Sequence, residues 1–170
     1  MAVHIVLVEP EIPQNTGNIV RTCAVTGSIL HLVKPLGFSV EDKYLKRAGL
    51  DYWSLSEIHY HECFEEVREE YATMPFFFCT TKASQCYSDV LYPEDFFLVF
   101  GKETAGLPEH LLLEHYDHCI RIPMISDARS LNLSNSVAII LYETLRQKSF
   151  IGLSKMGHLP FLCNRNTAGV

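Results

Sequence analysis

The chain has 170 residues, of which 48% are apolar and 20% charged, and its formal net charge is −6. This length and composition suit one globular domain and exclude an intrinsically disordered chain. No uncharged apolar run is long enough to span a membrane, no basic leader opens the sequence, and the six cysteines include no C-x-x-C pair, so we expect a cytoplasmic protein with reduced thiols and no membrane segment.

Short apolar runs alternate with polar, helix-like segments along the chain. Residues 4–9 and 28–33 have the character of buried strands, and a helix from about Thr16 to Thr26 is expected between them. We expect Asn15 to cap this helix and Gly27 to end it. The elements predicted further along are a helix over 42–50, a strand over 57–61, a helix over 63–71, strands over 76–80, 96–100 and 119–122, a short helix opened by Pro108, and a helix over 135–148.

The order of these elements indicates the fold class. Strands that are apolar on both faces and alternate with helices predict a mainly parallel sheet covered by helices on both faces, which is an α/β architecture. The regular pattern fades after Ile151. We therefore expect one domain over residues 1–150 and a tail or arm over 151–170.

Three loops that follow apolar strands combine glycine, proline and polar residues, and ligands bind at this position in open α/β sheets. The first loop carries Asn15, Asn18 and Arg21, which are spaced to share one side of a helix. An arginine near a helix N-terminus suits a phosphate group. A capping asparagine beside an ordinary surface arginine is the alternative interpretation.

The second loop, 101–108, contains Gly101 and Gly106, followed by Leu107-Pro108 where a phosphate-binding P-loop needs Lys-Ser/Thr. No G-x-G-x-x-G follows any strand, so a Rossmann fingerprint is absent as well. These glycines allow either a close approach to a ligand or an ordinary tight turn. The third loop, 126–136, contains several hydroxyl and amide side chains, more than one helix cap needs. Ser134 or Asn135 could cap the following helix, and the remaining side chains could bind a ribose, a carboxylate or an adenine edge.

A metal site is the weaker alternative. His59, His61 and Cys63 would share one face of a strand, which is a possible ligand set. No further pair of ligands lies near them in the sequence, so no metal is expected.

Taken together, the three loops resemble the three motifs of the SPOUT class of RNA methyltransferases. The motifs are N-x-G-N-x-x-R at 15–21, F-G-x-E-x-x-G-L-P at 100–108 and I-P-M…S-L-N-L-S-N-S-V-A at 122–138. Their order and spacing also match, and the resemblance covers about residues 3–150. The compact chain and its opening E-P-E-I-P-Q-N-T-G-N further resemble the bacterial members that methylate the ribose 2′-hydroxyl of the wobble nucleotide, position 34, in leucine tRNAs.

The resemblance implies a deep trefoil knot in the C-terminal half, S-adenosylmethionine (AdoMet) bound among the knot loops, S-adenosylhomocysteine as product, and a homodimer that acts on the tRNA anticodon stem-loop. It places Arg21 at the reaction centre. Cys79 stands where an aliphatic residue is usual, a change that a backbone contact would tolerate. The positions that carry over as cofactor contacts are Cys79, Thr80, Gly101, Ile122, Met124, Ser130 and Leu131.

Methyl transfer to an oxygen requires removal of a proton and stabilisation of the charge that develops. A guanidinium is effectively always protonated, so we expect Arg21 to bind the adjoining phosphate or the developing alkoxide. The RNA phosphate or Glu103 is then the candidate proton acceptor. The alternatives are 2′-O-methylation at another tRNA or rRNA position, a non-catalytic RNA-binding module on the same fold, and metal-dependent hydrolysis at His59 and His61.

The negative net charge is concentrated in one segment. Residues 57–70 contain six glutamates and one arginine, which leaves a net charge of about −1 on the rest of the chain. A local basic face is therefore possible, and the acidic segment should face away from RNA. The candidate RNA-binding residues are Asn15, Lys46, Arg47 and Arg129, with Lys43, Lys82 and Arg121 as further basic positions.

Overall fold

The computed structural model describes residues 2–39 and 52–157. The helix predicted over 42–50 lies outside these residues, as do the RNA-binding candidates Lys46 and Arg47. The strands of the described residues are β1 (Val3–Val8), β2 (Ile29–Val33), β3 (Ile58–His61), β4 (Phe76–Cys79), β5 (Gln85–Cys86), β6 (Phe96–Phe100) and β7 (Cys119–Arg121). The helices are α1 (Pro13–Thr26), α3 (Phe64–Glu70), α4 (Glu109–Glu114) and α5 (Leu133–Gln147), with 3-10 turns η1 (Tyr87–Asp89) and η2 (Tyr116–His118).

The seven strands form one sheet in the order β3-β2-β1-β6-β4-β7-β5, and every pair of neighbouring strands is parallel. This confirms the predicted α/β class. Because the strands are parallel, their carboxyl ends meet along one edge, where the three predicted loops begin. The deep trefoil knot and the division of the chain at residue 150 stay predictions.

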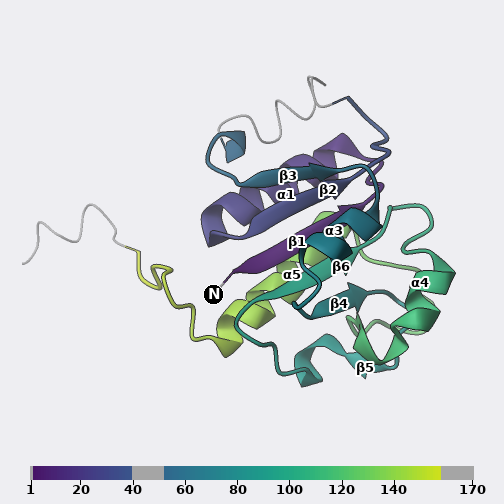
Figure 1. Cartoon of the computed structure of the whole chain (residues 1–170). Helices are drawn as coiled ribbons and strands as arrows, with labels where there is room; N and C mark the ends of the chain where they lie inside the picture. The colour runs from purple at the N-terminus through teal and green to yellow at the C-terminus, as the bar shows by residue number, and fades with distance from the viewer. Residues whose placement is uncertain (1, 40–51, 158–170) are drawn as a thin grey trace, which may run out of the picture.

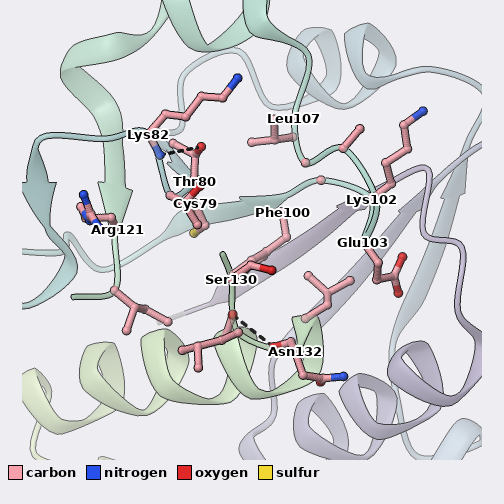
Figure 2. A pocket seen from close by; sticks show the side chains of 18 of the residues that line it. Cys79, Thr80, Lys82, Phe100, Lys102, Glu103, Leu107, Arg121, Ser130 and Asn132 are labelled. Atoms are coloured by element: carbon pink, nitrogen blue, oxygen red, sulfur yellow. Dashed lines mark hydrogen bonds between the residues drawn. The ribbon is translucent and has the colours of Figure 1, made fainter. Parts of the chain in front are cut away.

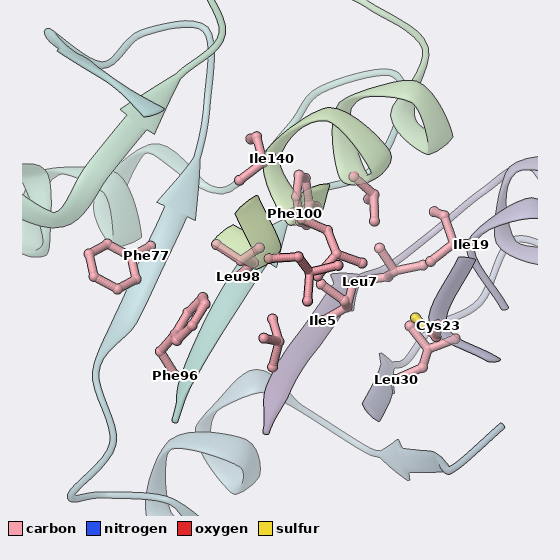
Figure 3. Close-up of a cluster of buried hydrophobic side chains, with 14 of the residues drawn as sticks. Ile5, Leu7, Ile19, Cys23, Leu30, Phe77, Phe96, Leu98, Phe100 and Ile140 are labelled. Atoms are coloured by element: carbon pink, nitrogen blue, oxygen red, sulfur yellow. The ribbon is translucent and has the colours of Figure 1, made fainter. Parts of the chain in front are cut away.

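Helices cover both faces of the sheet, as the apolar strands require (Figure 1). The side chains of β1 alternate between two apolar clusters: Ile5 and Leu7 pack with α1 and α5, whereas Val6 and Val8 pack with α3 and α4. Figure 3 shows the first cluster, in which Ile19 and Cys23 of α1 and Ile140 of α5 face the sheet. Helices α1 and α5 therefore lie side by side on one face, and the acidic helix α3 lies on the other.

Helix α1 begins at Pro13, three residues before the predicted start, and its N-cap is Ile12 rather than Asn15. Proline suits the first helical position, because its missing N–H would have no partner there and its φ is already helical. The predicted end is confirmed: Gly27 adopts the left-handed conformation, with φ at 69°, and its N–H donates to the Cys23 carbonyl.

Helix α5 also begins earlier than predicted. Its N-cap is Asn132, whose Oδ1 accepts from the backbone N–H groups of Ser134 and Asn135, so neither of the two predicted capping residues caps it. The sequence does not predict strand β5, because two residues are too few to show a pattern.

Four histidines lie on the α3 face of the sheet. His31 of β2 is fully buried, and its two ring nitrogens lie 2.9 Å from His4 Nδ1 and 2.9 Å from His61 Nε2. The ring of His59 stacks on His31 with 5.0 Å between ring centroids. Among residues 2–39 and 52–157, no group of three or more histidine, cysteine or acidic side chains is arranged to hold a metal ion.

Candidate active site

A cavity of about 630 Å³ opens at the carboxyl ends of β4, β6 and β7. It is lined by residues 79–82, 100–107 and 129–133, by the end of β7 and by the first turns of α5. Figure 2 shows Thr80 and Leu107 on one side of it and Ser130 and Asn132 on the other. Its volume is within the range of about 300–1,000 Å³ that is usual for sites binding small organic ligands.

The structure brings together all the residues that the sequence predicts as cofactor contacts. Segments far apart in the chain supply them, because the parallel strands deliver their loops to the same edge. The residues that line the cavity include Cys79, Thr80, Gly101, Ile122, Met124, Ser130 and Leu131. Their contact with a cofactor stays a prediction.

The loop after β6 folds back on itself beside the cavity. Gly106 has φ at 71° and donates its N–H to the Lys102 carbonyl at 2.8 Å. A Cβ added to Gly101 would lie 2.1 Å from the Gly106 carbonyl carbon, a distance that no side chain can adopt. Glycine is thus required at position 101 so that the loop can close.

Cys79 lies at the end of β4 against the cavity. Its Sγ is 3.9 Å from the Phe77 carbonyl oxygen, and burial holds the pKa of this thiol well above its usual range. The thiol therefore stays protonated near neutral pH and is unsuited to act as a nucleophile.

Basic side chains surround the opening of the cavity. Lys82 is 3.8 Å from Glu109, and Lys102 forms a 2.7 Å ion pair with Glu9. Arg121 and Arg129 also line the cavity, and neither forms an ion pair with any residue that the structure describes. Two guanidinium groups without a carboxylate partner suit the phosphates of a nucleic acid.

Glu103 borders the cavity, but its carboxylate is committed to the start of α1. Oε2 accepts from the Glu11 N–H at 2.8 Å, and Oε1 accepts from the Ile12 N–H at 3.3 Å and from Asn15 Nδ2 at 2.9 Å. These three donors occupy both carboxylate oxygens. The geometry therefore favours a positioning role for Glu103 over the predicted role of proton acceptor.

Asn15 is 5% exposed, and both ends of its side-chain amide are occupied. Its Nδ2 donates to Glu103, and its Oδ1 accepts from Asn132 Nδ2 at 2.8 Å. The structure thus gives this predicted RNA-binding residue protein partners. The exposed Arg129, by contrast, lies where RNA could reach it.

Arg21 is not among the residues that line the cavity of a single chain. It is exposed on α1, with its guanidinium carbon 4.7 Å from the centre of the Tyr52 ring. It lies six residues after Asn15, which corresponds to about 9 Å along the helix axis. The structure therefore places the predicted reaction-centre residue on the helix whose first turn reaches the cavity.

Comparison with known proteins identifies the family. Residues 2–142 match the model of the SpoU rRNA methylase family. The chain belongs to this family. A SpoU relative from Methylovorus glucosotrophus, named tRNA (cytidine(34)-2′-O)-methyltransferase, is 52% identical over 149 residues, which cover 87% of this chain and 97% of that protein.

Solved structures agree with this membership. One, from a study of the 2′-OH methylation of C/U34 on tRNA, has a TM-score of 0.83 and 39% identity, and the match covers 88% of this chain and 97% of that one. An AdoMet-bound rRNA methyltransferase from Sinorhizobium meliloti has a TM-score of 0.76 and 26% identity, and the match covers 85% and 56% of the two chains. In residues 2–39 and 52–157 of this SpoU family member, no helix has the length and apolar character needed to cross a membrane.

Proposed function

We propose that this protein transfers a methyl group from AdoMet to the ribose 2′-hydroxyl of nucleotide 34 in tRNA. The observation that carries the proposal is the convergence of three SpoU loops on one cavity of suitable size, in a chain 52% identical to a tRNA (cytidine(34)-2′-O)-methyltransferase. We further propose that the nucleotide is cytidine or a modified uridine, that leucine isoacceptors are the substrates, and that the reaction takes place in the cytoplasm.

The cavity has the chemistry that AdoMet requires. Leu107, Ile122 and Leu131 provide apolar surface for an adenine ring, and the Thr80 and Ser130 hydroxyls can bind ribose or amino-acid groups. The bound cofactor would supply an electrophilic methyl group on a sulfonium and leave as S-adenosylhomocysteine. The proposal requires no metal ion.

In this proposal the arginines bind the RNA. Arg121 and Arg129 would hold phosphates at the opening of the cavity, and Arg21 would bind the phosphate beside nucleotide 34 or the oxygen as it loses its proton. Since the Glu103 carboxylate already accepts three N–H groups, we propose the RNA phosphate as the proton acceptor.

We propose a homodimer as the functional form. One chain leaves Arg21 outside its own cavity lining, so a complete reaction centre needs either the RNA or a second copy to bring it close. Val25 on α1 and Ile139 and Tyr142 on α5 are large apolar side chains exposed in the single chain. A second copy that covers these neighbouring helices would bury them and would let one anticodon stem-loop contact both subunits.

The decisive experiment incubates the protein with AdoMet and total tRNA from a strain that lacks the enzyme. Ribose methylation is then mapped by mass spectrometry of nuclease fragments. We expect one new 2′-O-methyl group, at position 34 of leucine tRNAs. Methylation at another position would reject the proposed substrate, and AdoMet binding without any methylation would reject the proposed activity.

A further inference from the structure

We infer that Asn15 is a positioning residue whose buried amide fixes helix α1 to both cofactor-pocket loops at once. The inference rests on the proposed function, because it assigns to Asn15 the alignment of Arg21 with the cavity. It differs from the predicted role of this residue as an RNA contact.

The amide connects segments that are distant in the chain. Asn15 Nδ2 donates to Glu103 Oε1 at 2.9 Å across 88 residues, and Asn15 Oδ1 accepts from Asn132 Nδ2 at 2.8 Å across 117 residues. Among the side chains in the described part of the chain, Asn15 is the one that hydrogen-bonds to both of these residues. The polarity of the amide matches its neighbours, since a carboxylate must accept and Asn132 presents its amide nitrogen.

Each neighbour anchors a further element. Asn132 Oδ1 accepts from Ser134 N at 2.9 Å and Asn135 N at 3.3 Å, so the same side chain that donates to Asn15 also caps α5. Glu103 in turn accepts from the backbone before α1. Hydrogen bonds therefore connect the first turn of α1 to the Gly101–Gly106 loop through Glu103, and to the start of α5 through Asn132.

A second link supports the first on the Glu103 side. The Glu11 carboxylate accepts from the Thr104 N–H at 3.1 Å and from the Thr104 Oγ1 hydroxyl at 2.8 Å. Glu11 and the 103–104 loop therefore exchange hydrogen bonds in both directions. Loss of the Asn15 amide would leave this link in place but would release α1 from Asn132, and with it from the Ser130–Leu131 wall of the cavity.

Asn15 connects the loops that would bind the cofactor to the helix that carries Arg21. The loops that it joins line the cavity, and the helix that it starts carries Arg21 about 9 Å further along the axis. A buried side chain with both polar ends paired holds its partners in one arrangement, because any other arrangement leaves a buried group without a hydrogen bond.

The test is a double-mutant cycle that reverses the polarity of one hydrogen bond. Asn15→Asp keeps the acceptor for Asn132 but places a carboxylate against Glu103. Glu103→Gln replaces one of two acceptor oxygens by a donor, so position 103 can no longer accept from both the Glu11 N–H and Asn15. In the double variant, the glutamine amide introduced at position 103 can donate to the carboxylate introduced at position 15 and still accept from the Glu11 N–H, and only the longer 3.3 Å hydrogen bond from the Ile12 N–H loses its acceptor. Gln85→Glu is the matched control, because it makes the same change from amide to carboxylate on an exposed side chain of β5 that does not line the cavity.

Three measurements separate positioning from a general loss of structure. We expect each single variant to weaken AdoMet binding at least 10-fold by calorimetry, to slow single-turnover methyl transfer at saturating AdoMet and tRNA by a larger factor, and to speed amide hydrogen exchange in residues 101–107 and 130–133 without ligand. The double variant should recover to within about threefold of the wild type in all three, since the hydrogen bond is restored. The control should match the wild type.

Wild-type AdoMet affinity and exchange rates in Asn15→Asp, or a double variant no better than the worse single variant, would overturn the inference. The exchange measurement needs neither cofactor nor RNA. If recovery in the double variant is seen there while the wild-type protein methylates no tRNA at position 34, the positioning role stands and the proposed function fails. If the wild-type protein methylates position 34 but the cycle shows no recovery, the proposed function stands and the positioning role fails.

Discussion

The row of buried histidines makes the stability of this protein depend on pH. His31 lies in the middle of β2 with both ring nitrogens within 2.9 Å of other imidazoles, and it has no exposed surface. Burial, together with the neighbouring rings of His4, His59 and His61, lowers the pKa of His31 from 6.5 to about 3. Burial likewise lowers the pKa of His4, which Glu57 and Asp95 partly oppose, and that of His61, which Glu70 and Glu66 partly oppose.

The direction of the effect follows from the unfolded state. The unfolded chain takes up a proton on His31 near pH 6.5, whereas the folded chain does so only near pH 3. The contribution to stability is therefore complete above pH 6.5 and is lost as the pH falls from there towards 3. Each pH unit in this interval lowers the free energy of unfolding by about 1.4 kcal/mol, so His31 alone accounts for about 2 kcal/mol between pH 8 and pH 5.

Urea unfolding of the wild type and of His31→Gln at pH 8 and pH 5 measures this contribution, at one protein concentration because a dimer's stability depends on it. The glutamine can still donate and accept but does not titrate. We expect the loss of stability between the two pH values to be smaller by about 2 kcal/mol in the variant. His110→Gln, at an exposed position, should behave as the wild type. An equal loss in the wild type and in His31→Gln would refute the reasoning.

Three further predictions concern the site. Gly101→Ala should abolish measurable AdoMet binding, because its Cβ would overlap the Gly106 backbone; Gly27→Ala, with open space around the added carbon, should lower stability by about 1 kcal/mol and leave the AdoMet Kd unchanged in calorimetry. Arg21→Ala should slow single-turnover transfer about 100-fold or more with AdoMet affinity intact, and weakened AdoMet binding would argue against its RNA-side role. Arg129→Ala should remove one phosphate contact, so the slope of the logarithm of the tRNA binding constant against the logarithm of salt concentration should become shallower by about one. An unchanged slope in a filter-binding titration would contradict this.

Local sequence patterns predict every strand of the described sheet except β5, and most of its helices. The apolar strands β1 and β6 and the spacing in α5 predict both the α/β class and the edge at which ligands bind. Errors occur where a residue's role depends on distant partners. Asn15 has the residue type of a helix cap, but its partners lie 88 and 117 residues away. The start of α1 differs from the prediction because proline is as typical of a loop as of a first helical turn.

Only part of the site can likewise be predicted from the sequence. The resemblance to the family motifs identifies residues that line the cavity, whereas the hydrogen bonds of Glu103 cannot be predicted from its neighbours in the chain. The donors to its carboxylate are determined by the packing of α1 against the second loop, which no local pattern records. Asn132 could have been found locally, since asparagine is among the residues preferred at helix N-caps and this one stands directly before α5.

The separation of charge between the two sides of the sheet has a consequence for how a polyanion arrives. Glu65, Glu66, Glu69 and Glu70 are exposed on α3, on the opposite face from α1 and α5, whereas Arg121 and Arg129 border the cavity. Such a molecule has an electric dipole as well as a net negative charge. This charge distribution would repel a polyanion from the α3 face and would favour orientations in which the opening of the cavity faces it.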